Sequence, residues 1–111
     1  MDWKAYLDDQ SQALAKFRRE RPDTGRAFTS MHHASMSEGS LTVREKELIA
    51  LAIGISKQCV DCIGYHVQAA AKAGASRDDI SDVISIAVYM GGGPAYMYAV
   101  KALEAYDQLC E

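Results

Sequence analysis

The sequence predicts an all-α, single-domain bundle of about six helices over residues 1–111, on three observations. Apolar residues recur at three- and four-residue spacing through most of the chain, which is the pattern of amphipathic helices. Alternating β-branched and polar residues are nearly absent, whereas Ala, Leu, Met, Glu and Lys, which favour helix, are abundant. A chain of 111 residues corresponds to one domain, and a hydrophobic fraction of 49% can supply its core.

Two helices are expected before residue 40. The first covers about residues 3–20, with Trp3 and Leu7 among its apolar positions, and stops before Pro22 because proline disfavours helical geometry in the residue preceding it. The second covers about residues 22–36 and is expected to direct Phe28 and Met31 toward the interior. A loop over residues 37–40 follows.

The third and fourth helices have clear ends. Thr42 and Glu45 form a capping-box pattern that starts the third helix. That helix is apolar nearly all round as far as Ile55, which is typical of a central core helix, and it ends near residues 57–58. The fourth helix runs from about Cys59 to residue 73, and Gly74 is suited to the left-handed position that closes it.

The last two helices are separated by a glycine-rich break. Ser76 and Asp79 give another capping-box-like start, to the fifth helix. The sequence GGGP at residues 91–94 breaks this helix, and Pro94 is placed to start the sixth. The expected buried stripe of the fifth helix is Ile80, Val83, Ile84, Ala87 and Val88, and the small residues of the sixth are Ala95, Ala99 and Ala102.

Charge and hydropathy exclude several classes of protein. A net charge of −3 and a pI near 5.6 argue against nucleic acid or acidic lipid as the main partner. The first residues lack a basic segment followed by an apolar run, and no stretch reaches the roughly 18 apolar residues of a membrane span. We therefore expect a cytoplasmic protein with no membrane partner.

The residues with the clearest chemical potential are Cys59, Cys62 and His66. Three cysteines without an export signal do not indicate a disulfide scaffold, so a CxxC pair suggests redox chemistry or metal binding. Cys59 lies at the start of the fourth helix, where free backbone amides stabilise a thiolate. Cys62 and His66 follow on the same face, and an imidazole beside two thiols can relay a proton. Cys110 is expected to be incidental.

Glu47 is the second unusual residue, because it enters a very apolar helix. A carboxylate at the edge of a buried run suits proton transfer. The alternative is an exposed residue on the first helical turn, favoured there by the helix dipole. The residues alone leave both interpretations open.

The stretch from Thr42 to Leu109 resembles the carboxymuconolactone decarboxylase-like superfamily, in its AhpD-like alkylhydroperoxidase branch. The matching segments are EKELIALAIG, CVDCIGYH, KAGAS and GGGPAYMYA, and Glu47, Cys59, Cys62 and His66 fit the pattern E-x11-C-x2-C-x3-H. The resemblance implies an all-α bundle that assembles into homotrimers or homohexamers and uses no cofactor or metal.

The resemblance also implies a role for each residue. Cys62 matches the cysteine that attacks peroxide, and Cys59 matches the cysteine that acts as proton donor and then closes the disulfide. Glu47 and His66 match a proton relay acting on Cys59. The helix dipole alone would instead favour Cys59 as the attacking thiol. Peroxidase members often have histidine immediately before the second cysteine, and Asp61 stands there in this sequence. Its negative charge is expected to raise the thiol pKa and slow attack.

The leading hypothesis is therefore a peroxiredoxin-type thiol–disulfide oxidoreductase. Its partners would be a hydroperoxide or disulfide substrate and an electron donor, either a dithiol protein or a small thiol. Three alternatives stay open. One is a decarboxylase-type lyase using His66 and Glu47, one is a zinc module using Cys59, Cys62 and His66, and one is an oligomer whose disulfide only senses redox state.

Overall fold

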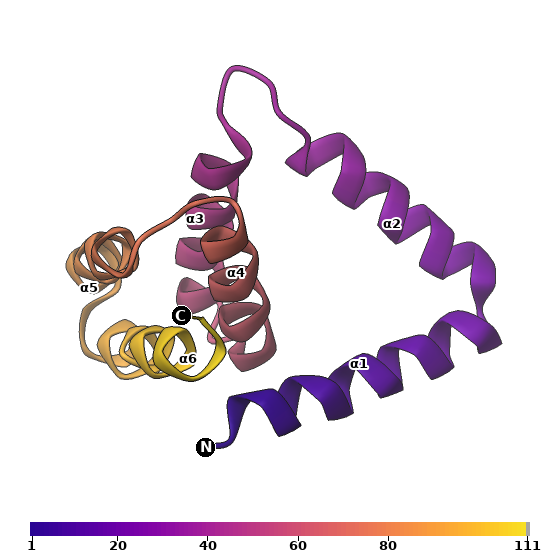
Figure 1. Cartoon of the computed structure of the whole chain (residues 1–111), viewed down its shortest axis with the longest axis horizontal. Coiled ribbons are helices and arrows are strands. Elements are labelled where there is room, and N and C mark those ends of the chain that lie inside the picture. The colour runs from indigo at the N-terminus through magenta and orange to yellow at the C-terminus, as the bar shows by residue number, and fades with distance from the viewer. Residues whose placement is uncertain (111) are drawn as a thin grey trace.

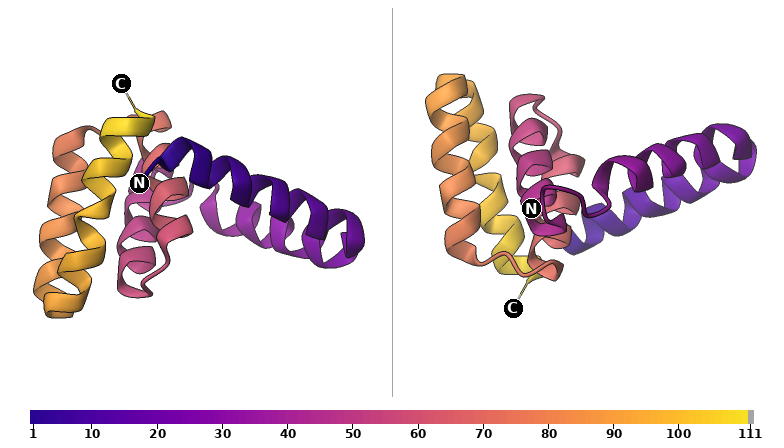
Figure 2. Two further views of the ribbon diagram at one scale, coloured as in Figure 1. Left: turned by 90° about the horizontal axis from the view of Figure 1, so that it is seen from below. Right: turned by 90° about the horizontal axis from the view of Figure 1, so that it is seen from above.

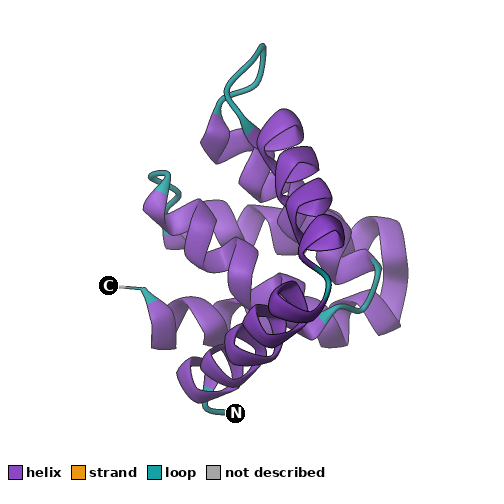
Figure 3. Cartoon of the chain, turned by 90° about the vertical axis from the view of Figure 1, so that its right-hand side faces the viewer, coloured by secondary structure: helices purple, strands orange, loops and turns teal. Residues whose placement is uncertain are grey.

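The computed structural model describes residues 1–110, and these residues form α-helices and no strand (Figures 1 and 3). The elements are α1 (Trp3–Glu20), α2 (Pro22–Met36), α3 (Val43–Ser56), α4 (Val60–Lys72), α5 (Arg77–Ala99) and α6 (Lys101–Leu109). The predicted all-α class with six helices is confirmed.

The helices divide into a body and an arm. In the body, α3 packs against α4 and α5, and α6 packs against α4 and α5. The arm is the hairpin of α1 and α2, which extends away from the body in Figure 1 and in both views of Figure 2. Of the two arm helices, α1 contacts α4 and α6, whereas α2 lies mainly along α1 and makes a smaller contact with α3.

The predicted helix starts are confirmed by complete capping boxes. The Thr42 hydroxyl accepts from the Glu45 amide, and the Glu45 carboxylate accepts from the Thr42 amide at 2.8 Å. Ser76 and Asp79 make the same reciprocal pair at the start of α5. The backbone amide at the first residue of each box holds the pKa of the Glu45 and Asp79 carboxyls below its usual range.

The predicted break in the fifth helix occurs at Gly92. Its φ of 72° and ψ of −156° are non-helical, and glycine reaches such angles without a steric penalty. The bounds differ from those expected, because α5 is continued across this kink to Ala99 and α6 begins at Lys101. Val100 between them keeps near-helical angles. Within residues 1–110, no single helix has the length and apolarity to cross a membrane, and α5 with α6 meets that test only as a pair bent by 47°.

The core lies between α3, α4, α5, α6 and the first turns of α1. Its largest fully buried side chains are Trp3, Leu51, Ile55, Ile63, Val67 and Ile80. The alanines predicted to allow close packing of the last helix, Ala95, Ala99 and Ala102, are buried, as is the α5 stripe apart from the half-buried Val88.

Two expectations about burial are wrong. Phe28 and Met31 of α2 are 70% and 62% exposed, because α2 packs mainly against α1 and no body helix covers its apolar face. The all-round apolar α3 is also only partly enclosed. Its residues Ile49 and Ile53 face outward, because α4 and α5 cover only the rest of the helix.

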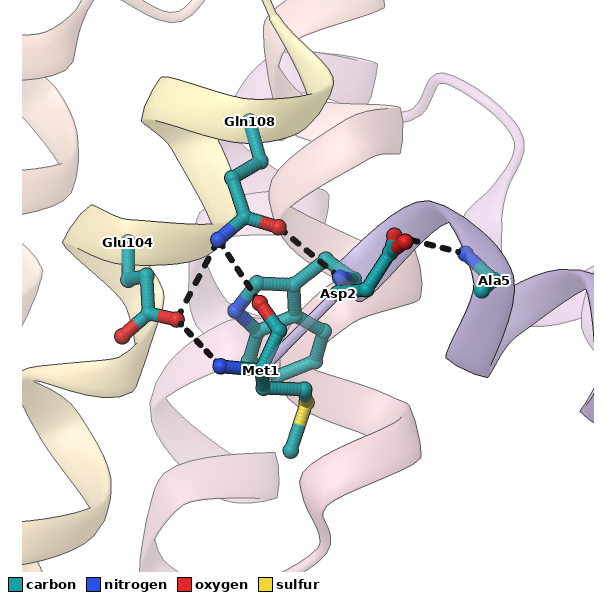
Figure 4. A network of polar contacts seen from close by, with 6 residues as sticks. Met1, Asp2, Ala5, Glu104 and Gln108 are labelled. Atoms are coloured by element: carbon teal, nitrogen blue, oxygen red, sulfur yellow. Dashed lines mark hydrogen bonds and ion pairs between the residues drawn. The ribbon is translucent and has the colours of Figure 1, made fainter.

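The start of α1 is tied to the end of α6 by polar contacts (Figure 4). The Gln108 side chain accepts from the Trp3 amide at 2.8 Å and donates to the Met1 carbonyl at 2.8 Å. Glu104 pairs with the Met1 amino group at 3.2 Å. These contacts seat Trp3 in the core against Gly64 of α4, so α1 is fixed at its base.

Candidate functional site

The connection between α3 and α4 sets the position of Cys59. After Lys57, Gln58 adopts the left-handed conformation with φ 57°, and its amide donates to the Ile55 carbonyl at 3.0 Å. The Cys59 amide donates to the Gly54 carbonyl at 3.0 Å. This pair of bonds is the Schellman ending of a helix, with glutamine where glycine is usual.

Cys59 also begins α4. It is the N-cap residue, and its Sγ accepts from the Cys62 amide at 3.2 Å. An amide directed at sulfur, at the positive end of a helix, favours a negative charge on that sulfur. One residue thus ends α3 and caps α4, which leaves the Cys59 backbone little freedom.

Cys59 and Cys62 form a disulfide, with 5.2 Å between their Cα atoms. Both residues are partly exposed, so a small molecule can reach the pair from solvent. Behind them, α3 approaches closely at Gly54. A Cβ built on Gly54 would lie 3.0 Å from Cys62 Cβ, so a larger residue would displace the start of α4.

Glu47 and His66 meet beside the disulfide. His66 lies one turn after Cys62 on α4, and its Nδ1 is 2.7 Å from Glu47 Oε1 on α3. Glu47 is only 6% exposed. An ionised carboxylate can only accept hydrogen bonds, so in that state Nδ1 carries the proton and Nε2 is free to accept another.

A hydrogen bond connects the CxxC segment to α1. The Tyr6 hydroxyl donates a hydrogen bond to Asp61 Oδ1, between the two cysteines in sequence. This hydrogen bond raises the pKa of Tyr6 above its usual value of 10.0, because the neighbouring carboxylate stabilises the protonated phenol.

The structure places the four predicted site residues on α3, at the N-cap of α4 and in the first two turns of α4. It joins Cys59 to Cys62 and Glu47 to His66, and it rejects an exposed position for Glu47. The roles assigned to these residues remain predictions. Cys110 lies elsewhere, at the end of α6, and partial burial raises the pKa of its thiol.

Sequence reasoning missed Gly54 and Tyr6. The two contacts that make them important, with Cys62 and Asp61, join different helices and leave no local pattern. For the zinc alternative, residues 1–110 contain no group of three or more histidine, cysteine or acidic side chains arranged to hold a metal ion.

The fold and site together define an all-helical protein with a CxxC disulfide, in which a buried glutamate pairs with a partly exposed histidine one turn after the second cysteine. Residues 22–105 match the model of the carboxymuconolactone decarboxylase family, and the chain belongs to this family. An uncharacterised protein of Cupriavidus necator is 36% identical over 108 residues, covering 97% of this chain and 96% of that protein.

Two solved structures share the architecture. A carboxymuconolactone decarboxylase family protein from Legionella pneumophila superposes with a TM-score of 0.95 at 41% identity, over 98% of this chain and 97% of that one. A family member from Thermotoga maritima superposes with a TM-score of 0.73 at 27% identity, over 87% and 89% of the two chains. The latter is described as having a possible involvement in antioxidative response.

Proposed function

We propose that this protein is a thiol–disulfide oxidoreductase that reduces hydroperoxides, of the AhpD-like alkylhydroperoxidase type. The observation that carries the proposal is the partly exposed Cys59–Cys62 disulfide at the start of a helix, with the Glu47–His66 pair one turn away. The antioxidative context of the Thermotoga maritima relative supports the same chemistry.

The reaction has two steps on the protein. The Cys62 thiolate attacks one peroxide oxygen and the O–O bond breaks, so Cys62 becomes a sulfenic acid, while the leaving alkoxide takes the proton of the Cys59 thiol and departs as the alcohol. The Cys59 thiolate then attacks the Cys62 sulfur, which forms the disulfide and releases water once the leaving hydroxide is protonated. The two cysteines together supply the two electrons that reduce the peroxide.

Glu47 and His66 act on the proton of Cys59. The Glu47 carboxylate keeps the proton of His66 on Nδ1, so Nε2 can accept the proton of the Cys59 thiol. The Cys62 amide then stabilises the thiolate on Cys59. This division reconciles the helix dipole with the assignment of attack to Cys62, because the dipole activates the resolving cysteine.

An external dithiol, either a donor protein or a small thiol, completes the cycle. It attacks the disulfide, passes through a mixed disulfide and leaves oxidised, which returns two electrons to the pair. The partial exposure of both cysteines leaves room for such an approach.

The test is hydroperoxide consumption with dithiothreitol as donor, comparing the native protein with Cys62→Ser, Cys59→Ser and Glu47→Gln. We expect Cys62→Ser to lose peroxide reduction, whereas Cys59→Ser, which cannot form the disulfide, should consume one equivalent of peroxide in a single burst when no dithiol is present. We expect Glu47→Gln to lower kcat by roughly a hundredfold, the lower end of the range for general acid–base catalysis. Cys110→Ser is the matched control and should retain the native rate.

Equal rates in the native protein and both serine variants would refute the proposal. The decarboxylase-type alternative predicts a different pattern, since activity on a small lactone acid would rely on Glu47 and His66 and would survive loss of both cysteines. Assaying the double cysteine variant on a carboxylated lactone separates the two functions.

We also propose that copies of the chain associate, as a homotrimer or homohexamer. The supporting observation is a groove of apolar side chains between α3 and α5, here called the α3–α5 groove, in which Ile49, Ile53, Ile86 and Met90 are all exposed. Apolar patches of this kind on a small protein mark interaction sites.

A further inference from the structure

Asp61 places a negative charge within the CxxC segment, and the Tyr6 hydroxyl donates a hydrogen bond to it. Among residues 1–110, Asp61 forms no ion pair with a lysine, arginine or histidine, and its side-chain hydrogen bond comes from Tyr6. Asp61 lies in the first turn of α4, where the helix dipole favours a carboxylate.

We propose that Tyr6 is a positioning residue for the CxxC pair, whose phenol holds the Asp61 carboxylate and so limits the penalty its charge imposes on the thiolates. This inference rests on the proposed function, because it concerns the same cysteines. It adds a residue from α1 to a site otherwise built from α3 and α4.

The physical argument follows from charge. A carboxylate close to a thiolate destabilises the thiolate and raises the thiol pKa. A hydrogen bond donated by the phenol spreads the negative charge over a larger group and fixes the carboxylate oxygen toward α1. Without the phenol, Asp61 would be free to turn and would carry its full charge.

Tyr6 is held where this contact requires. It lies between Trp3 and Leu7, which are both buried against Gly64 of α4, and its ring meets the Trp3 ring edge-on at 6.2 Å between centroids. The packing of α1 on α4 therefore fixes the phenol relative to the CxxC segment.

The other charges near the site are already paired or lie in solvent. On α1, Lys4 pairs with Asp8. On α3, Glu47 pairs with His66. Lys57, two residues before Cys59, is exposed. Tyr6 is therefore the group through which α1 modifies the charge of Asp61.

The experiment measures the rate of alkylation of the reduced protein by iodoacetamide against pH, in a Cys110→Ser background so that only Cys59 and Cys62 report. We expect Tyr6→Phe to raise the apparent thiol pKa and to slow alkylation at pH 7 by about threefold. Asp61→Asn removes the charge, so its rate should rise, by roughly tenfold. The Tyr6→Phe, Asp61→Asn double variant should be alkylated at the same rate as Asp61→Asn alone.

The matched control is Tyr65→Phe. Tyr65 also bridges α4 and α1, through hydroxyl contacts with the Leu7 carbonyl at 3.0 Å and Ser11 Oγ at 2.6 Å, but it does not contact Asp61. It should leave the pH profile of alkylation unchanged. Trp3 fluorescence verifies that α1 stays docked in every variant.

Three results would overturn the inference: no shift in Tyr6→Phe, an equal shift when Asp61 is already asparagine, or an equal shift in Tyr65→Phe. Alkylation needs no peroxide, so a failure of this inference and a failure of the proposed peroxidase activity can be told apart. A native protein without peroxidase turnover but with the expected shifts would retain this inference and lose only the proposed activity.

Discussion

At the scale of single residues, Cys59 has both a structural and a chemical role. Its amide completes the Schellman ending of α3, and its sulfur accepts from the Cys62 amide as the cap of α4. This geometry requires the preceding Gln58 to adopt a left-handed conformation. The positions of both cysteines therefore depend on a backbone conformation that glutamine adopts only at a cost.

Replacing Gln58 with glycine should stabilise the protein. The left-handed conformation destabilises a non-glycine residue by about 1–2 kcal/mol, and glycine removes this strain. Glycine also has greater freedom in the unfolded chain, which lowers stability by about 0.4–1 kcal/mol. We expect a net rise of about 0.5–1 kcal/mol in the free energy of unfolding, measured by urea denaturation of the oxidised protein.

The matched control for this prediction is Gly74→Ala. Gly74 occupies the equivalent position after α4, with φ 102°, and nothing lies within 4 Å of an added Cβ. Alanine at this position would have to adopt the left-handed conformation, which is strained for any residue but glycine, so Gly74→Ala should lower the free energy of unfolding. A Gln58→Gly variant less stable than the native protein would show that the glutamine side chain contributes more than its backbone costs.

Residue-level features were predictable from the sequence where they depend on local chemistry. The caps at Thr42 and Ser76 and the left-handed Gly74 follow from side chains within a few positions. The Glu47–His66 contact spans 19 positions and the Tyr6–Asp61 contact spans 55. The first was anticipated only through resemblance to a family, and the second could not be anticipated, because both depend on how separate helices pack.

At the scale of elements, the packing of α1 against α4 requires a residue without a side chain at Gly64. A Cβ on Gly64 would lie 2.8 Å from Trp3 Cζ3 and 3.0 Å from Leu7 Cδ2. Trp3 and Leu7 are the two buried residues of α1, so this contact is the apolar part of the attachment between the arm and the body.

Gly64→Ala should loosen α1. Alanine favours helix over glycine by about 1 kcal/mol, but overpacking costs typically about 1–3 kcal/mol, and the rigid indole ring has little room to move aside. We expect a net loss of stability of about 1 kcal/mol and a red shift of the fluorescence from Trp3, the only tryptophan, which is 1% exposed in the native fold.

Gly39→Ala is the control for this substitution. Gly39 lies in the loop between α2 and α3, where an added Cβ would meet only Lys46 Nζ at 3.8 Å, an ordinary contact. Its fluorescence and stability should match those of the native protein. An unshifted spectrum in Gly64→Ala would mean that α4 and α1 adjust without separating.

Amphipathic patterns predicted that each helix forms but not which faces are covered. The pattern of α2 placed Phe28 and Met31 on one apolar side, and this was interpreted as a side facing the core. In the structure that side has no body helix against it. Periodicity describes the helix alone, whereas coverage depends on the path of the chain through the α1–α2 arm (Figure 2).

At the scale of the whole molecule, the single chain leaves large apolar side chains exposed on several of its helices. Exposed side chains occur along the α3–α5 groove, on the arm and around the kink of α5, where Tyr89 and Met97 are exposed. The chain is small, so its own helices cannot cover these faces as well as the core. Burial between copies would remove this surface from water.

The α3–α5 groove gives the sharpest test of association. Ile53 and Ile86 are 54% and 60% exposed, so lysine at both positions should cost the isolated chain little. Between copies, the same lysines would be buried without partners, which opposes assembly. We expect light scattering at micromolar concentration to give a native mass several times 12.1 kDa and a lower mass for Ile53→Lys, Ile86→Lys. Gln12→Lys, at an exposed polar position on α1, should keep the native mass. A native mass of one chain would refute association, and an unchanged mass in the double variant would place the interface on another face.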